Sequence, residues 1–294
     1  MNRQFGGALA LLLCASPIPA ISQGMEAVSV TGQMELEHTR RNGASGTLLH
    51  GDFTLAYSGG IGFELGAVAD QDLQEGTDAF ALFGAVTFGT SFGDVAVGAP
   101  RPAADLLIEI PTFAGMHELQ MGINANEPSV VTALSQSSGD QSYGARVTSE
   151  SGALRYGASL HRLQSQNGTY WQVAGEYATG SGTEIEGVIE GEDGNLGVLI
   201  GANHQAGQFD LGLYLTSQHI NGASDAVQGY AGYQISDALT LRGHLRMEDG
   251  PTSSQNLIGL EAAYDFTNGA YAQFGAADGN ETSMTLDASV GFKF

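Results

Sequence analysis

The sequence predicts an antiparallel β-barrel that spans a membrane, and three observations point to this fold class. The last twelve residues, Ser283–Phe294, alternate strictly between apolar side chains and small, polar or charged ones, as in a strand with one apolar face. Segments of about 10 residues with the same alternation recur along the chain between turn-forming residues. The composition, with 43 Gly, 14% charged residues and a mean hydropathy near zero, fits apolar residues that are diluted by alternation.

The amino-terminal segment predicts export. Arg3 precedes an apolar run from Leu9 to Cys14, and Ala20-Ile21-Ser22 offers small residues at the positions that signal peptidase reads. We therefore expect residues 1–22 to be a signal peptide, with cleavage after Ala20 or Gly24 as alternatives, and residues 23–294 to form the barrel. The one cysteine falls in this leader, so the mature barrel is expected to have no disulfide.

The net charge restricts the partners. The formal net charge of −22 at pH 7 argues against nucleic acid and against anionic lipid headgroups as binding partners. No stretch after the leader approaches the about 20 consecutive apolar residues of a transmembrane helix. A chain that crosses the membrane with strands satisfies its backbone hydrogen bonds by closing the sheet.

Alternation predicts sixteen strands, with fourteen as the alternative count. An even number places both termini on the same, periplasmic side, where the tight turns are expected. The longer and more polar connections, such as Gly191–Asp193, are expected on the outer side. The predicted strands are residues 28–37, 47–57, 61–69, 79–88, 94–99, 141–148, 153–162, 169–178, 182–190, 194–204, 207–217, 226–235, 238–248, 255–266, 269–277 and 283–294.

One long segment interrupts this rhythm. Residues 100–140, which follow the fifth strand, contain four prolines and show no clean period. An irregular segment of this length between tight hairpins points to a functional role.

Several patches resemble the trimeric general porins of Gram-negative bacteria, especially the Rhodobacter-type porins of alphaproteobacteria. The matching patches are Gly62–Ala67, Gly89–Gly98, Gly259–Phe266, Ala276–Asp278 and the terminal Phe292-Lys293-Phe294. The resemblance implies a trimer of sixteen-stranded barrels in the outer membrane, in contact with lipid and lipopolysaccharide. It also implies that the loop after the fifth strand folds into the lumen and narrows it, at the position of residues 100–140.

The resemblance further implies that acids on this loop face arginines on the wall. The loop candidates for the constriction are Asp105, Glu109, Glu118, Glu127 and Arg101. Alternation turns Arg146, Arg155, Arg242, His244 and Arg246 inward, together with Glu184 and Glu186. The alternative is that these charges are solvated lumen or loop residues without a role in selectivity.

The remaining patterns give weaker indications of function. Outward aromatic residues near strand ends are expected to form an interfacial girdle, namely Tyr57, Trp171, Tyr177, Tyr233, Tyr264, Phe266, Phe292 and Phe294. The run Gly89–Gly93 matches a nucleophile elbow, but it falls in a strand-to-strand turn rather than before a helix. We expect no catalysis, no cofactor and no metal site, although the acidic segment Glu190–Asp193 could hold Ca²⁺.

The sequence therefore predicts an outer-membrane porin for passive diffusion of small hydrophilic solutes and ions, with a preference for cations. The alternatives are an outer-membrane barrel enzyme, a protease or lipase, and a secreted β-rich adhesin. Detergent-solubilised protein that hydrolyses peptides or esters would favour the enzyme. Recovery in the soluble fraction without channel formation would favour the adhesin.

Overall fold

The computed structural model describes residues 28–74, 76, 78–119, 127–165, 168–218, 220, 224–250 and 254–294, without the side chains of Glu118 and Gln218. The predicted signal peptide, residues 1–22, lies outside the described residues. The side chain of Glu118, which was predicted to lie at the constriction, is also outside the described residues.

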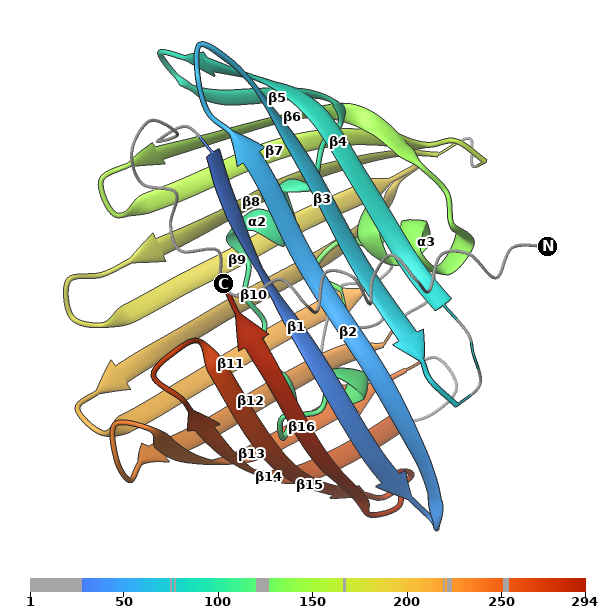
Figure 1. Ribbon diagram of the computed structural model, residues 1–294, viewed down its shortest axis with the longest axis vertical. Helices are drawn as coiled ribbons and strands as arrows, with labels where there is room; N and C mark the ends of the chain where they lie inside the picture. Colours follow the sequence, from blue (N-terminus) through green and yellow to red (C-terminus); the bar gives the residue numbers. More distant parts are fainter. Residues whose placement is uncertain are drawn as a thin grey trace.

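The described residues form one closed barrel of sixteen antiparallel strands, in which each strand pairs with its neighbours in sequence (Figure 1). The barrel closes between the first and last strands, where the Gly32 amide donates to the Phe294 carbonyl and the Phe294 amide to the Gly32 carbonyl, both at 3.0 Å. This closure confirms the predicted count of sixteen. The strands are β1 Val28–Arg41, β2 Ala44–Tyr57, β3 Ile61–Asp72, β4 Asp78–Thr90, β5 Gly93–Ala99, β6 Ser142–Ser151, β7 Leu154–Leu163, β8 Thr169–Ala178, β9 Thr183–Glu192, β10 Asn195–Ala206, β11 Phe209–Gln218, β12 Asp225–Gln234, β13 Leu239–Asp249, β14 Ser254–Asp265, β15 Ala270–Gly279 and β16 Thr285–Lys293.

Alternation separates the two faces of the wall as predicted. In β13, Leu245 and Met247 are about 60% exposed on the outside, whereas the inward-facing His244, next to Leu245, is buried. In β9, Ile185 and Ile189 are exposed while Glu186 is buried. Since every described strand presents large apolar side chains outward and these strands close into a barrel, the outer face suits hydrocarbon rather than water.

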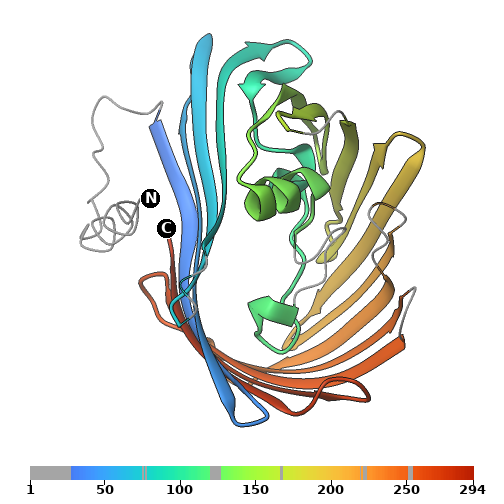
Figure 2. The same cartoon turned by 90° about the vertical axis from the view of Figure 1, so that its right-hand side faces the viewer.

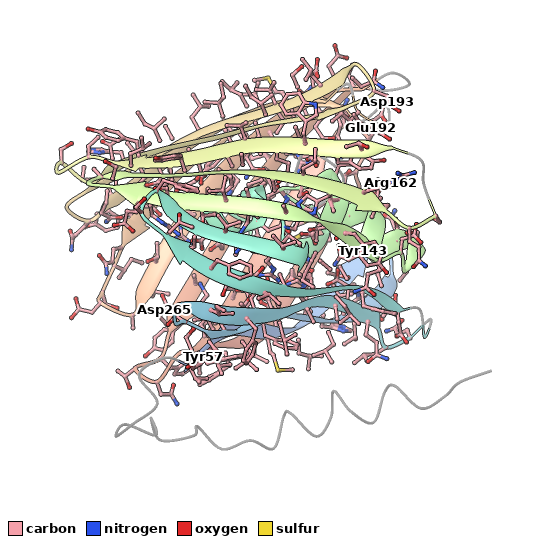
Figure 3. All side chains as sticks on the ribbon, turned by 90° about the horizontal axis from the view of Figure 1, so that it is seen from above. Tyr57, Tyr143, Arg162, Glu192, Asp193 and Asp265 are labelled. Carbon is pink, nitrogen blue, oxygen red and sulfur yellow. The ribbon has the colours of Figure 1, made fainter. Side chains whose placement is uncertain are left out.

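The aromatic residues mark the two rims of the wall. Tyr57, Tyr177, Tyr233 and Tyr264 are exposed at the ends of β2, β8, β12 and β14, which run to the same rim. Trp171, at the start of β8, is exposed near the other rim. Figure 3 shows these rims, with Tyr57 and Asp265 on one and Tyr143, Arg162 and Glu192 on the other. The remaining predicted members, Phe266, Phe292 and Phe294, also end their strands, with the Phe292 and Phe294 rings stacked at 6.3 Å.

Two connections are shorter than the sequence pattern predicts. β1 continues to Arg41 and turns through Asn42-Gly43, whose φ angles are +52° and +80°. β9 continues to Glu192 and turns through Asp193-Gly194, with φ angles of +45° and +92°. Such pairs form two-residue turns that match the strand twist. The predicted longer connection over residues 191–193 is therefore wrong, because polar residues extend the strands beyond their apolar stretch.

The described residues between β5 and β6, 100–119 and 127–141, lie inside the barrel, and we call them the inserted loop (Figure 2). It is less irregular than predicted, because it contains α2 (Ala103–Leu107), the 3₁₀ turn η1 (His117–Leu119) and α3 (Val130–Ser138). The Ser129 side chain caps α3 by accepting from the Val131 amide at 3.1 Å. Gly139 ends α3 in the left-handed region, with φ +67°. None of the described helices is long and apolar enough to cross a membrane.

Candidate functional site

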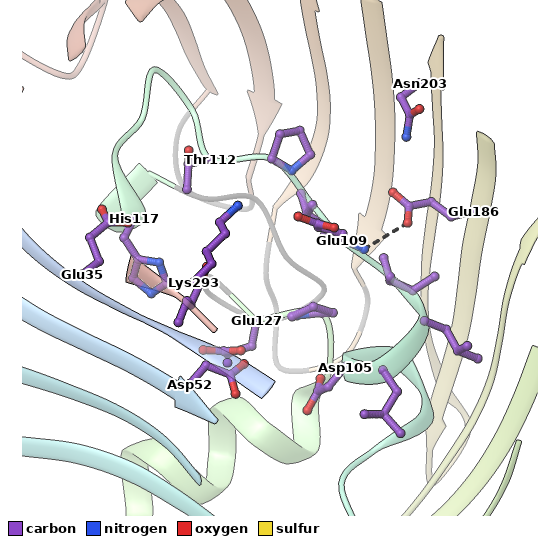
Figure 4. A pocket seen from close by; sticks show the side chains of 18 of the residues that line it. Glu35, Asp52, Asp105, Glu109, Thr112, His117, Glu127, Glu186, Asn203 and Lys293 are labelled. Carbon is purple, nitrogen blue, oxygen red and sulfur yellow. Dashed lines mark hydrogen bonds between the residues drawn. The ribbon is translucent and has the colours of Figure 1, made fainter. Parts of the chain in front are cut away.

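A cavity of about 880 Å³ lies between the inserted loop and the barrel wall. Its described lining contains eleven acidic side chains but four that are permanently cationic, which makes the lumen strongly acidic. Figure 4 shows loop acids Asp105, Glu109 and Glu127 around this space, with Asp52 and Glu186 from the wall. The four cations are Arg101, Arg155, Arg242 and Lys293.

The inserted loop enters the lumen through a buried network of charges. The Arg146 guanidinium on β6 donates to both carboxylate oxygens of Glu64 on β3, at 2.8 and 2.6 Å. Arg146 also donates to the carbonyl of Arg101 at 2.9 Å. The Arg101 guanidinium in turn pairs with Asp52 on β2. These charge-assisted bonds fix the first residue of the loop after Pro100 against three strands.

Backbone amides and apolar side chains also attach the inserted loop to the wall. The Ala103 amide donates to Ser159, and the Ala104 amide donates to Gln172, each at 3.2 Å. The Val130 amide at the start of α3 donates to Glu190 at 2.9 Å, which satisfies a free helix-terminal donor. The helices bury an apolar cluster against β7 to β11; its members include Ala103, Ala104, Leu107, Val130, Val131, Leu163, Tyr170, Ala174, Val188, Leu199 and Tyr214. We call residues 101–110 together with α3 the root of the loop.

The middle of the loop makes two further backbone contacts. The Glu109 amide donates to the Glu186 carboxylate at 3.0 Å (Figure 4), and Gln228 donates to the Pro111 carbonyl at 3.2 Å. The Glu109 side chain remains exposed in the cavity. Glu186 therefore positions the loop as well as lining the lumen.

Residues 113–119 form the tip of the loop, which packs on glycines of the wall. A Cβ atom at Gly275 would lie 1.9 Å from the Ala114 carbonyl oxygen, and one at Gly259 would lie 2.8 Å from Ala114 Cβ. The tip can approach β14 and β15 this closely because both positions lack a side chain. Phe113 and Met116 are fully buried in this contact.

Polar contacts hold the far side of the tip. The His117 amide donates to Glu37 on β1 at 3.1 Å, and Arg246 on β13 donates to the Leu119 carbonyl. Phe113 lies against the ring of His244, with centroids 5.4 Å apart. His244 and Arg246 thus lie beneath the loop and support its tip.

The arginines that face the cavity are paired with carboxylates of the wall. Arg242 donates to Asp210 at 3.0 Å and to Glu261 at 2.8 Å. Arg155 donates to Glu176 at 2.8 Å. Because Arg242 and Arg155 each have an acidic partner on a neighbouring strand, Glu261 on β14 and Glu176 on β8, the wall presents ion pairs rather than a row of free positive charges.

Burial changes the protonation of three groups on the loop. It raises the pKa of Asp105 to about 7, against the opposing effect of Arg101, and Thr132 donates to this carboxyl. Burial, together with Asp105 and other acids, raises the pKa of Glu127 well above its ordinary value. Burial and the nearby His50 lower the pKa of His117 to about 4, so this imidazole is neutral at pH 7.

The structure divides the predicted site residues into two groups. Asp105, Glu109, Glu127, Arg101, Arg155, Arg242, Glu184 and Glu186 line the cavity. Arg146, His244 and Arg246 point inward as predicted, but they lie under the inserted loop and hold it in place. Alternation gives the direction of a side chain, and it cannot tell whether a loop covers that side chain.

Sequence reasoning missed the acids that partner these arginines. Asp52, Glu64, Asp210 and Glu261 are all on inward positions, and that parity was the available signal. It also missed the pairing of His50 with Asp70 beside His117, because these residues come together only through folding.

No protein-family model matches the sequence, and no curated protein matches it. Solved structures do match its fold. A multiply substituted form of the porin from Rh. blastica aligns with a TM-score of 0.66 and 16% identity, over 91% of this chain and 100% of that chain. The chain has the porin fold. A triple mutant of Rhodopseudomonas blastica porin aligns over the same shares, with a TM-score of 0.64 and 15% identity.

The porin fold is the fold that the resemblance to Rhodobacter-type porins implied. It also accounts for the Gly89–Gly93 run, because β4 ends at Thr90 and β5 begins at Gly93, which makes this segment a hairpin turn. A nucleophile elbow requires a strand followed by a helix, so Ser91 lacks that context.

Proposed function

We propose that the protein is an outer-membrane porin, which lets small hydrophilic solutes and ions diffuse passively and prefers cations. The observation that carries this proposal is the acidic cavity between the inserted loop and the wall, whose described lining holds eleven carboxyl groups against four permanent cations. Fixed negative charge in a low-dielectric wall raises the local concentration of cations and lowers that of anions. The apolar outer face and the aromatic rims support a membrane location.

Planar bilayers test both parts of the proposal. The detergent-solubilised protein is expected to give discrete conductance steps, and a gradient of KCl is expected to give a reversal potential that favours K⁺ over Cl⁻. A silent bilayer would contradict the channel. A reversal potential of the opposite sign would contradict cation preference while leaving the channel intact.

A matched pair of substitutions locates the selectivity. Glu109→Gln removes one charge from the cavity without changing shape, and it should reduce the K⁺/Cl⁻ permeability ratio by about 1.5- to 2-fold. Glu150→Gln removes an exposed charge at the end of β6 and serves as the control. Equal ratios in both variants would show that the net charge of the protein, rather than the cavity, sets the preference.

The assembly and the alternatives have their own tests. We propose a homotrimer surrounded by lipid and lipopolysaccharide, and cross-linking in detergent followed by mass measurement checks it.

Calcium binding by Glu190–Asp193 stays a prediction. In the structure, the Glu190 carboxylate accepts a hydrogen bond from the Val130 amide. Hydrolysis of peptides or esters by the purified barrel, lost on substituting a rim or lumen side chain, would instead support the barrel enzyme.

A further inference from the structure

Two histidines and an aspartate come together where the tip of the inserted loop meets β2 and β3. His50 Nδ1 lies 2.6 Å from Asp70 Oδ1, and His117 Nε2 lies 3.7 Å from the same oxygen. The two imidazole rings are 4.0 Å apart between centroids. One potential ligand atom from each of the three residues lies within 4.8 Å of the other two.

We infer that His50, Asp70 and His117 form a binding site for a divalent transition-metal ion of the Zn²⁺ type, which fastens the loop tip to the barrel wall. Two imidazole nitrogens and one carboxylate are a ligand set that Zn²⁺ accepts readily, with a fourth position left for water. Calcium and magnesium prefer sites made of oxygen ligands.

The two distances to Asp70 Oδ1 fit this assignment. Ligand atoms at the bond lengths of tetrahedral zinc lie about 3.3 Å apart, and the observed separations of 2.6 and 3.7 Å fall on either side of this value. The His50–Asp70 hydrogen bond would open by less than about 1 Å to admit the ion. His117 Nε2 is buried and has no hydrogen-bond partner among the described residues. No other group of the described residues therefore competes with a metal ion for this nitrogen.

Neighbouring groups orient the three ligands from outside the site. Gln136 on α3 donates to Asp70 Oδ2 at 3.1 Å, which leaves Oδ1 turned toward the histidines. Glu37 accepts from the His117 amide and fixes the start of η1. Such contacts are the usual support of metal ligands. Both histidines line the cavity, so an ion can reach them from the lumen, and Figure 4 shows His117 across the cavity from Glu186.

The test measures metal binding to the folded barrel in detergent, without any transport assay. After treatment with a chelator, Zn²⁺ alone is titrated by calorimetry, and the metal content per chain is measured after removal of free ion. We expect about one Zn²⁺ per chain and a rise in the midpoint of thermal unfolding on binding. Co²⁺ in place of Zn²⁺ should give visible absorption bands of a tetrahedral site with nitrogen ligands.

Substitutions assign the site. His117→Gln and Asp70→Asn are expected to abolish this binding, and Gln136→Leu is expected to weaken it by about 10- to 100-fold. His38→Gln is the control, because His38 lies on β1 and pairs with Thr47 outside the cluster. Binding that is absent from the parent, or equal in His117→Gln and His38→Gln, would overturn the inference. If one variant does not fold, His50→Gln tests the same site from the wall.

Discussion

The root and the tip of the inserted loop are held against the barrel by different kinds of interaction. The root buries two helices in an apolar cluster and fixes its first residue with the bidentate Arg146–Glu64 pair. The tip buries fewer apolar side chains and relies on two glycines and on contacts with Glu37 and Arg246. Since burial contributes roughly in proportion to apolar area, the root is expected to be the more stable attachment.

This difference separates two tasks within one loop. A root that hardly moves keeps Asp105, the one acid of α2, at a constant place in the cavity. A tip held by polar contacts and shape can be displaced without unfolding the barrel. Substitutions at the root should therefore change stability, whereas substitutions at the tip should mainly change the width of the pore.

The largest effect is expected from Arg146→Met. The change leaves the buried Glu64 carboxylate without its bidentate partner and the Arg101 carbonyl without a donor. Removing one member of a buried ion pair costs about 3–5 kcal/mol. The free energy of unfolding, measured in urea by the heat-modifiable shift on gels, should fall by this amount.

Arg162→Met is the matched control, because Arg162 is exposed at the rim (Figure 3). Its unfolding free energy should stay within about 0.5 kcal/mol of the parent value. A similar loss in both variants would show that Arg146 acts through the general charge of the barrel and not through the root.

The root and the tip also differ in how far the sequence foretells them. Alternation predicts all sixteen strands and the inward direction of Arg146 and Arg242, because side chains on a strand have a period of two. One helix of the root, α3, carried local signals in Ser129 before it and Gly139 after it, which the alternation of apolar residues does not capture. The tip carried none, since its contact with Gly275 joins residues far apart in sequence. Partner choice, such as Arg242 with Asp210 and Glu261, depends on strand register and is fixed by folding.

A smaller effect on stability, but a larger one on conductance, is expected from Gly275→Ala. The new methyl group would lie 1.9 Å from the Ala114 carbonyl oxygen, so the tip must move away from β15. Overpacking of this kind costs about 1–3 kcal/mol. Single-channel conductance should fall, because a tip displaced from the wall extends further into the lumen.

Gly243→Ala on β13 controls for loss of a strand glycine, because its added Cβ would meet only Leu260 Cδ2 at 3.9 Å, an ordinary contact. Its conductance should equal that of the parent. If Gly275→Ala also conducts like the parent, the tip does not help to define the aperture. The root and the tip would then differ in stability but not in their effect on conductance.

The smallest effect concerns the pH dependence of selectivity at the root. Burial raises the pKa of Asp105 to about 7, so this carboxyl is largely ionised at pH 8 and largely protonated at pH 5. Protonation removes a negative charge from the cavity as the pH falls, and the K⁺/Cl⁻ permeability ratio should fall by less than about 2-fold over this range.

The raised pKa of Asp105 also affects stability. Because this pKa exceeds the value of 3.8 for a free carboxyl, the folded state binds more protons than the unfolded chain between these two pH values. The same group therefore favours folding at low pH and loses that contribution as the pH rises through about 7.

Asp105→Asn isolates this group from the other charges that face it, which include Arg101, Asp52, Arg146 and Glu127. The amide oxygen can still accept from Thr132, so the root keeps its geometry. The variant should show at pH 8 the lower permeability ratio that the parent reaches only in acid, and its ratio should change less between pH 8 and pH 5. An unchanged pH profile in Asp105→Asn would mean that a different carboxyl titrates. The root would then position the loop without contributing to the titration of the pore.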